Sequence, residues 1–368
     1  MERLPNWADL VLVPLVSLLM AAIIAGVIIK ILGESPVAAF KLMASGALGT
    51  QEGVGYTLYY ATNFIFTGLA VAVAYHAGLF NIGAEGQAYI GGLGTGLVCL
   101  WLGESPFWVV LPLAVLAGAV SGAAWAFIPA YLQAKRGSHI VITTIMFNYI
   151  ASAVLIFLLV DVLRPDGQMD PATANFPEAT TLPTLNQIPV FNLFFTSKVP
   201  ANVTLLIALA AAFGVWALLW RTRLGYSIRA FGKSEDAARY AGINPFKITM
   251  IAMLLSGALA GMMAINNVMG EAGRLLQNSA SGAGFIGIAV ALMGRNHPLG
   301  VVLAAILFGF LFQGGAELGM WTKIPIEMRV VVQGLVILFT GALDVMVRMM
   351  LTRIFAAFRG SKTAKGAV

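Results

Sequence analysis

The chain has 368 residues, of which 59% are hydrophobic and only 10% are charged, whereas soluble domains carry roughly 25% charged residues. This composition excludes an ordinary soluble protein and predicts a polytopic integral membrane protein. The net charge of +6 does not indicate a nucleic-acid partner, because the basic residues collect in short loops and near the C-terminus. One cysteine, Cys99, excludes an intramolecular disulfide, and three histidines far apart in the sequence give no metal-ligand spacing.

Apolar runs predict an all-α fold of about ten transmembrane helices, some of them short or broken. The first run, residues 10–32, would form a helix of about 34 Å, enough to cross the hydrocarbon core. It is longer than a signal-peptide core and is expected to be retained. Further runs lie at residues 61–79, 86–102, 107–131, 140–163, 201–220, 248–268, 284–294, 299–314 and 330–350. The run 284–294 is too short to cross alone and is expected to be a half-helix.

The polar segments between these runs predict the orientation. Residues 33–60 are amphiphilic and are expected to lie along the outer interface. Residues 164–200, rich in Pro, Thr and Asn, predict an external loop. Residues 221–247 hold six Lys or Arg against only Glu235 and Asp236, and residues 351–368 are basic. Because Lys and Arg favour the cytoplasmic side, both of these segments and both termini are expected in the cytoplasm.

A glycine-rich stretch at residues 78–92 places Asn81, Glu85 and Gln87 within apolar sequence. An ionisable residue at membrane depth is costly and usually faces a protein-lined or watery interior. One interpretation is a turn between two ordinary helices, with Glu85 solvated. The favoured one is a broken helix, because glycines let the backbone leave helical geometry where it lines a cavity. The three polar residues would then lie beside a translocation pathway or hold the broken helix in shape.

A weak internal repeat accompanies this stretch. Residues 66–73 read FTGLAVAV and residues 285–292 read FIGIAVAL, and each run is followed by a glycine- and asparagine-bearing break. A chance match between apolar runs is the alternative. If the repeat is real, residues 81–87 and 294–300 occupy related positions, as interrupted segments do near the substrate path of repeat-built transporters.

The basic loop contains signals for a short helix. Ser234 precedes Glu235 and Asp236, which suits a helix start, and Gly242 suits its end. The small side chains of Ala237 and Ala238 favour docking of this helix to a soluble partner over a simple connection.

Two further polar groups allow two interpretations each. Thr144 and Asn148 are one helical turn apart and share a face. They would hydrogen-bond a substrate or join two helices. Arg295, Asn296 and His297 precede Pro298, and a structural turn is favoured there over substrate contact.

Four separated motifs together resemble the permease subunits of bacterial ABC importers for simple sugars and nucleosides. They are residues 81–87 (NIGAEGQ), 141–150 (VITTIMFNYI), 237–244 (AARYAGIN) and 287–300 (GIAVALMGRNHPLG). The resemblance runs from about residue 57 to 350 and is strongest to the longer permease of nucleoside systems with a basic-membrane-protein type lipoprotein. Residues 236–242 also resemble the loop of ABC permeases that carries the coupling helix, although its further Ile and Leu-Pro are absent.

The resemblance implies that residues 1–368 are a single transmembrane permease domain in the bacterial inner membrane. Its implied partners are cytoplasmic ABC ATPases, a second permease in a heterodimer, an external substrate-binding lipoprotein and membrane lipid. The coupling residues would be Ser234, Glu235, Asp236, Ala237, Ala238 and Gly242, and the pathway residues Asn81, Glu85, Gln87, Thr144 and Asn148.

The residues themselves agree with a subunit that is not an enzyme. No Gly-x-x-x-x-Gly-Lys-Ser/Thr motif is present, so a partner must bind ATP, and no cofactor is expected on this chain. The alternative is an ion-coupled secondary transporter, for which only Glu85 is a candidate proton carrier. A lipid-modifying membrane enzyme is disfavoured because no nucleophile and base are paired.

Overall fold

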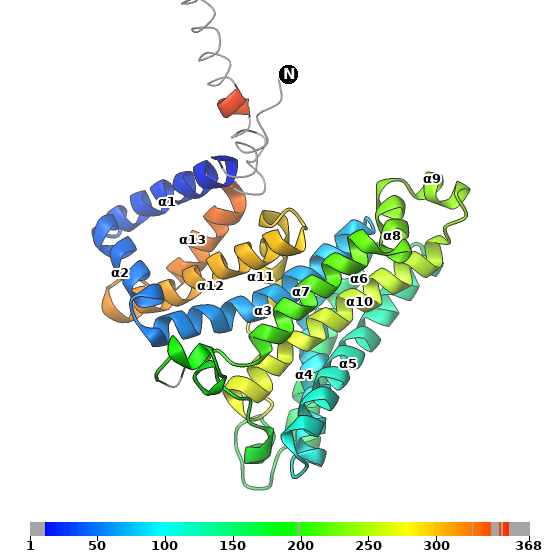
Figure 1. The fold of residues 1–368 in the computed structure, drawn as a ribbon, viewed down its shortest axis with the longest axis horizontal. Coiled ribbons are helices and arrows are strands. Elements are labelled where there is room, and N and C mark those ends of the chain that lie inside the picture. Colours follow the sequence, from blue (N-terminus) through cyan, green and yellow to red (C-terminus); the bar gives the residue numbers. More distant parts are fainter. Residues whose placement is uncertain (1–11, 198, 326, 340–345, 347–348, 353–368) are drawn as a thin grey trace, which may run out of the picture. The chain divides into compact units, whose positions relative to one another are not determined.

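The computed structural model describes residues 12–197, 199–325, 327–339, 346 and 349–352, and every regular element in these ranges is helical (Figure 1). The predicted all-α fold is confirmed. Within the described residues each of the ten predicted runs coincides with a helix: α1 (Val13–Ile31), α3 (Gln51–His76), α4 (Ala84–Leu102), α5 (Phe107–Arg136), α6 (Ile140–Phe157), α7 (Thr204–Arg221), α10 (Pro245–Ile265), α11 (Ala283–Met293), α12 (Pro298–Trp321) and α13 (Met328–Ile337). The basic tail, residues 353–368, lies outside the described residues.

Among the described helices, seven are long and apolar enough to cross a membrane: α1, α3, α5, α6, α7, α10 and α12. π-Helical turns extend α6 to Val162 and α10 to Ala272. Helix α11 spans only 11 residues, about 16 Å, so it is too short to cross alone, as the sequence predicts. Helix α4 has 19 residues, but glycines and polar residues in its first turns lower its hydropathy.

Helix α3 begins ten residues earlier than predicted. The amphiphilic segment 33–60 is divided between α2 (Pro36–Leu48) and the first turns of α3. The Thr50 hydroxyl accepts the backbone N–H of Gly53 at 3.0 Å and caps the helix. The Gln51 Oε1 atom accepts a hydrogen bond from the backbone N–H of Thr196, also at 3.0 Å. These polar residues lower the hydropathy of the first turns of α3. The apolar run in the sequence therefore starts later than the helix itself.

Two compact units divide the chain. Unit 1 combines the chain up to Ala47 with the chain from Leu311, and unit 2 is Leu48–Phe310. In unit 1, helix α1 packs against α13, and the second half of α12 lies close to α2. A Cβ atom built on Gly46 would lie 2.3 Å from the Glu317 side chain.

Unit 2 is built on the close packing of α4, α5 and α10. A Cβ atom built on Gly91 would lie 2.4 Å from the Cα atom of Gly261, and one on Gly261 would lie 2.1 Å from the carbonyl oxygen of Gly118. The three backbones therefore meet where only glycine fits, as expected of helices that associate within a membrane.

The long loop after α6 is folded. It contains the 3₁₀ turns Glu178–Thr180, Leu185–Gln187 and Phe191–Leu193. Leu182 and Leu185 are buried in it. The backbone N–H of Phe176 donates to the carbonyl of Gly273 at 2.7 Å, so the loop is attached to the segment after α10.

Candidate functional site

The chain between α3 and α4 is non-helical and lies within the protein. Helix α3 ends at His76 and α4 begins at Ala84, and Gly78 has a φ of +72°. Glu85 is only 4% exposed, and its two carboxylate oxygens accept the backbone N–H groups of Gly282 and Gly284, both at 2.8 Å. The interpretation of Glu85 as a solvated turn residue is therefore wrong. The α3–α4 connection, residues 77–83, is a break between two helices in which only Gly78 is exposed.

Asn81 and Gln87 hold the two sides of this break together. The Asn81 amide donates to Gln87 Oε1 at 2.9 Å and to Ser256 Oγ on α10 at 2.8 Å. Its own oxygen accepts the backbone N–H of Gly83 at 2.8 Å. Asn81 is fully buried, so these contacts satisfy it without water.

Thr144 and Asn148 on α6 face the same connection. Thr144 Oγ1 accepts the backbone N–H of Ile82 at 3.3 Å. The Asn148 amide donates to the carbonyl of Ile82 at 2.8 Å and accepts the backbone N–H of Gly86 at 2.9 Å. The structure thus places all five predicted pathway residues around the break. Four of them, Asn81, Gln87, Thr144 and Asn148, bond to one another or to backbone groups of residues 82–86, whereas Glu85 bonds to Gly282 and Gly284. The role of the five residues beside a pathway stays a prediction.

The two halves of the predicted repeat pack against each other. Gly68 on α3 and Gly287 on α11 occupy the same position in the two copies. A Cβ atom on Gly287 would lie 2.5 Å from the Thr67 side chain, and one on Gly68 would lie 3.0 Å from Val290. The two copies therefore pack closely against each other at the glycine that occupies the same position in each.

The segments that follow the two repeat copies both contact one tryptophan, Trp220. Sequence reasoning missed this residue. The Trp220 ring lies 5.2 Å from the His76 ring and 4.9 Å from the His297 ring, measured between centroids. His76 Nε2 donates to the carbonyl of Asn296 at 3.0 Å. The available signal was that each histidine lies within five residues of the end of a repeat copy, His76 after residue 73 and His297 after residue 292.

The basic loop forms two helices, α8 (Arg223–Lys233) and α9 (Glu235–Tyr240). The Ser234 hydroxyl accepts the backbone N–H of Ala237 at 3.3 Å, and Gly242, with a φ of +81°, follows the helix end. The short helix predicted from these caps is confirmed as a structure. Sequence reasoning missed Tyr240, whose side chain is 99% exposed.

The α9 surface differs from the expected one in one respect. Ala238 is buried, with 3% of its surface exposed, so it is not available to a docking partner in this structure. Glu235 forms an exposed ion pair with Arg239 at 3.2 Å. Asp236 and Ala237 lie on the exposed part of α9.

A second buried polar cluster, also missed, joins α3 to the π-helical end of α10. Asn63 donates to Asn267 Oδ1 at 2.8 Å, and Asn266 donates to Asn63 Oδ1 at 2.9 Å. Tyr59 donates to Asn267 at 2.6 Å and also to Glu271. The adjacent asparagines inside an apolar run were the available signal.

These features define a class: a multi-pass helical membrane protein whose helices are interrupted at buried polar residues. The chain belongs to the family described as branched-chain amino acid transport system / permease component, whose model matches residues 53–341. It is therefore a membrane permease subunit of the ABC transporter type. ATP hydrolysis belongs to a separate ATPase subunit, as the resemblance implies.

Three relatives are similar over most of their length. The glucose ABC transporter permease protein of Haloferax volcanii is 35% identical over 89% of this chain and 86% of the relative. The guanosine ABC transporter permease protein of Bacillus subtilis is 34% identical over 90% and 93%. The nucleoside ABC transporter permease protein of Lactococcus lactis is 34% identical over 96% and 97%. No solved structure shows a significant match to the chain, and nothing in these similarities supports the ion-coupled alternative.

Proposed function

We propose that this chain forms, together with a different second permease, the pathway of an ATP-driven importer for a neutral polar solute. A nucleoside is the first candidate, because two of the three relatives above are named for guanosine or nucleosides. A simple sugar is the second, because the Haloferax volcanii relative is named for glucose.

The chemistry of the buried polar residues is the observation that supports a neutral solute. Among the buried residues of the described part, Glu85 is the only Asp, Glu, Lys or Arg. The other buried residues with polar side chains in this set are Asn, Gln, Ser and Thr. Both carboxylate oxygens of Glu85 are already bonded to backbone N–H groups. An ionic solute or a transported proton would favour an available buried charge, whereas hydroxyl and amide groups suit an uncharged polar solute.

The second permease is inferred from the relatives. Bacillus subtilis and Lactococcus lactis each have another nucleoside or guanosine permease, each 31% identical to this chain. A pair of unlike permeases, cytoplasmic ATPases and an external binding lipoprotein would complete the transporter. The basic loop, residues 221–247, and both termini would be cytoplasmic in a bacterial inner membrane, and no cofactor would bind this chain.

Coupling to ATP would act through α9. Docked ATPases would displace α9 and the adjoining α8, since the two helices meet at Ser234. Helix α8 packs its Gly232 against the backbone of the α3–α4 connection. The displacement would therefore reach the break that Asn81, Glu85 and Gln87 hold in shape, and alternating access would follow from tilting of the helices on either side.

The test is reconstitution of the four kinds of subunit in proteoliposomes, with labelled guanosine or glucose outside. Uptake should require the lipoprotein and ATP inside and should persist when an ionophore removes the proton gradient. Uptake without ATP that the ionophore abolishes would reject the proposal and favour the ion-coupled alternative.

A further inference from the structure

An apolar groove of about 420 Å³, the α7–α12 groove, lies in unit 2 between α7 and the start of α12. Its lining is apolar except for one imidazole, and its two walls include Leu209, Phe213, Trp216, His297, Leu299 and Val302. Phe213 is 67% exposed and Leu299 is 65% exposed, so the groove is open to the surroundings of the protein. Because α7 and α12 are both long and apolar enough to cross a membrane, these surroundings are lipid.

The α7–α12 groove fits within one leaflet, the one that borders the basic loop. Leu209 and Trp216 are seven residues apart, which is about 10 Å along a helix. Half of a hydrocarbon core is about 15 Å thick. Helix α7 ends at Arg221, five residues after Trp216, and the basic loop begins there. A lipid whose acyl chain lies in the groove therefore has its headgroup near the level of Arg221.

Two guanidinium groups reach this end of the groove from different helices. The Arg221 Cζ atom lies 5.1 Å from the centre of the Trp216 ring, which lines the groove. The Arg229 Cζ atom on α8 lies 5.8 Å from the Trp220 ring, and that ring is 4.9 Å from the imidazole of His297, which also lines the groove. A guanidinium stacked on a ring keeps N–H donors at its edge, where they are available to an anion.

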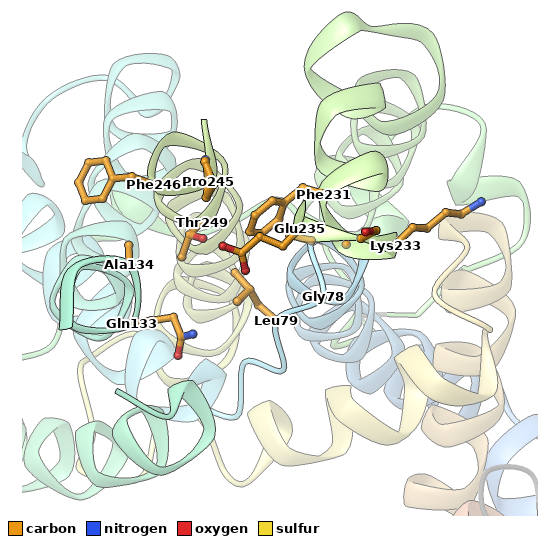
Figure 2. Close-up of a pocket in the computed structure, with 13 residues that line it drawn as sticks. Gly78, Leu79, Gln133, Ala134, Phe231, Lys233, Glu235, Pro245, Phe246 and Thr249 are labelled. Carbon is orange, nitrogen blue, oxygen red and sulfur yellow. The ribbon is translucent and has the colours of Figure 1, made fainter. Parts of the chain in front are cut away.

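The protein itself does not neutralise these two charges. Neither Arg221 nor Arg229 forms an ion pair with a carboxylate of the described residues. Helix α8 ends in another cation, and Figure 2 shows the Lys233 side chain directed away from the polar cavity beside this helix. Basic sites between transmembrane helices attract anionic lipid headgroups, and guanidinium groups bind phosphate oxygens through strong charge-assisted hydrogen bonds.

We propose that the α7–α12 groove binds one anionic phospholipid from the leaflet that borders the basic loop. One acyl chain lies along Phe213 and Leu299, and the phosphate accepts hydrogen bonds from Arg221 and Arg229. A zwitterionic lipid brings its own cation to the same two arginines and binds less tightly. A helix of a second permease would cover the apolar walls equally well, but only an anionic group matches the two arginines, and the phospholipid supplies one.

The experiment uses the full-length permease with its partner subunits in phosphatidylcholine vesicles. The vesicles contain a small share of phosphatidylglycerol with brominated acyl chains. Bromine quenches tryptophan fluorescence at short range, so Trp216 reports a chain in the groove. Brominated phosphatidylglycerol should quench the wild-type protein more than the same share of brominated phosphatidylcholine. Most of this excess should disappear in Trp216→Phe, which keeps an aromatic wall.

A charge variant tests the headgroup contact. Arg221→Gln should need about fivefold more phosphatidylglycerol for the same quenching, the effect of one basic residue at a membrane surface. The matched control is Arg136→Gln, because Arg136 is an exposed arginine at the end of α5. The last turns of α5 and α8 line one cavity, so the control lies on the same side of the membrane. It should retain the wild-type dependence on phosphatidylglycerol.

Three results would overturn the proposal. Equal quenching of the wild-type protein by the two brominated lipids would show that the groove does not select an anionic lipid or that a partner subunit covers it. Equal weakening in Arg221→Gln and Arg136→Gln would reduce the effect to general attraction by a basic surface. An excess that persists in Trp216→Phe would place the lipid elsewhere.

A second measurement covers variants that assemble poorly. The melting temperature of the full-length permease in detergent is recorded with and without added phosphatidylglycerol. The lipid should raise the melting temperature of the wild-type protein and of Arg136→Gln, because a ligand that binds only the folded state stabilises it. It should raise that of Arg221→Gln less. A wild-type protein that does not respond, or an equal rise in both variants, would reject the site.

Discussion

Gly78 and Gly232 touch through their backbones, although 153 positions lie between them. A Cβ atom built on Gly232 would lie 2.8 Å from the Gly78 nitrogen and 2.2 Å from the His76 carbonyl oxygen. Helix α8 is therefore in direct contact with the first residues of the α3–α4 connection. No flexible side chain separates the two, so a movement of α8 is not absorbed between them.

The first prediction follows from this contact. Gly232→Ala should force the two backbones apart, at a cost of about 1–3 kcal/mol for an overpacked site. We expect reduced uptake and reduced substrate stimulation of ATPase activity in protein that assembles with its partners. The control is Gly214→Ala on α7, because a Cβ there would meet nothing within 4 Å. Equal uptake by the two variants would contradict a transmitting role for this contact.

The second prediction concerns Glu85. Glu85→Leu removes both acceptors for the buried N–H groups of Gly282 and Gly284, and each unpaired group costs about 1–3 kcal/mol. We expect a lower melting temperature and a lower folding yield. Glu85→Gln keeps one acceptor and should retain most of the yield and uptake. Thermal unfolding in detergent measures the melting temperature of the two variants. The exposed Glu178→Leu serves as the control. Loss of uptake in Glu85→Gln at unchanged yield would point to a proton carrier instead.

A third prediction concerns the surface of α9. Tyr240 is fully exposed, whereas Ala238 is buried, so Tyr240 is the side chain that a docked ATPase would meet. Tyr240→Ala should lower uptake and leave basal ATP hydrolysis unstimulated by substrate, with unchanged melting of the permease. Ala238→Trp should instead destabilise the loop by overpacking. Tyr226→Ala on α8, also exposed, serves as the comparison, and normal coupling in Tyr240→Ala would argue against docking at this residue.

The fourth prediction tests orientation by thiol labelling. Thr180 is a poor site in the long loop because it is buried and its hydroxyl donates to the Pro177 carbonyl. Met169, 94% exposed, is a better one. Met169→Cys should react with a membrane-impermeant reagent in intact cells, and Tyr240→Cys only after lysis. Cys99, fully buried, contributes little background. The reverse pattern would invert the proposed topology.

The positions of the helices could be predicted from the sequence because lipid requires long apolar runs whose backbone bonds are internal. The start of α3 could not, since Gln51 and Thr50 are polar yet bonded within the structure. The partners of Glu85 were also out of reach. Gly282 and Gly284 lie almost 200 positions further along the chain, and nothing local indicates that they meet Glu85.

Two further misses have different causes. Asn266 and Asn267 were concealed by the apolar run around them, although paired amides at membrane depth are costly unless bonded. The burial of Ala238 could not be foreseen because a helix of six residues has too few turns to define a buried face. By contrast, the caps of that helix were predictable, since Ser234 and Gly242 act through their own backbone neighbours.

The indole of Trp220 contacts the imidazoles of both His76 and His297. His76 is the last residue of α3, His297 directly precedes α12, and Trp220 lies near the end of α7. Packed groups of this kind change between discrete arrangements and do not deform gradually. A rotation of this one ring would break both contacts in a single step. The three helix ends should therefore separate cooperatively, in an all-or-none event set by one side-chain rotamer.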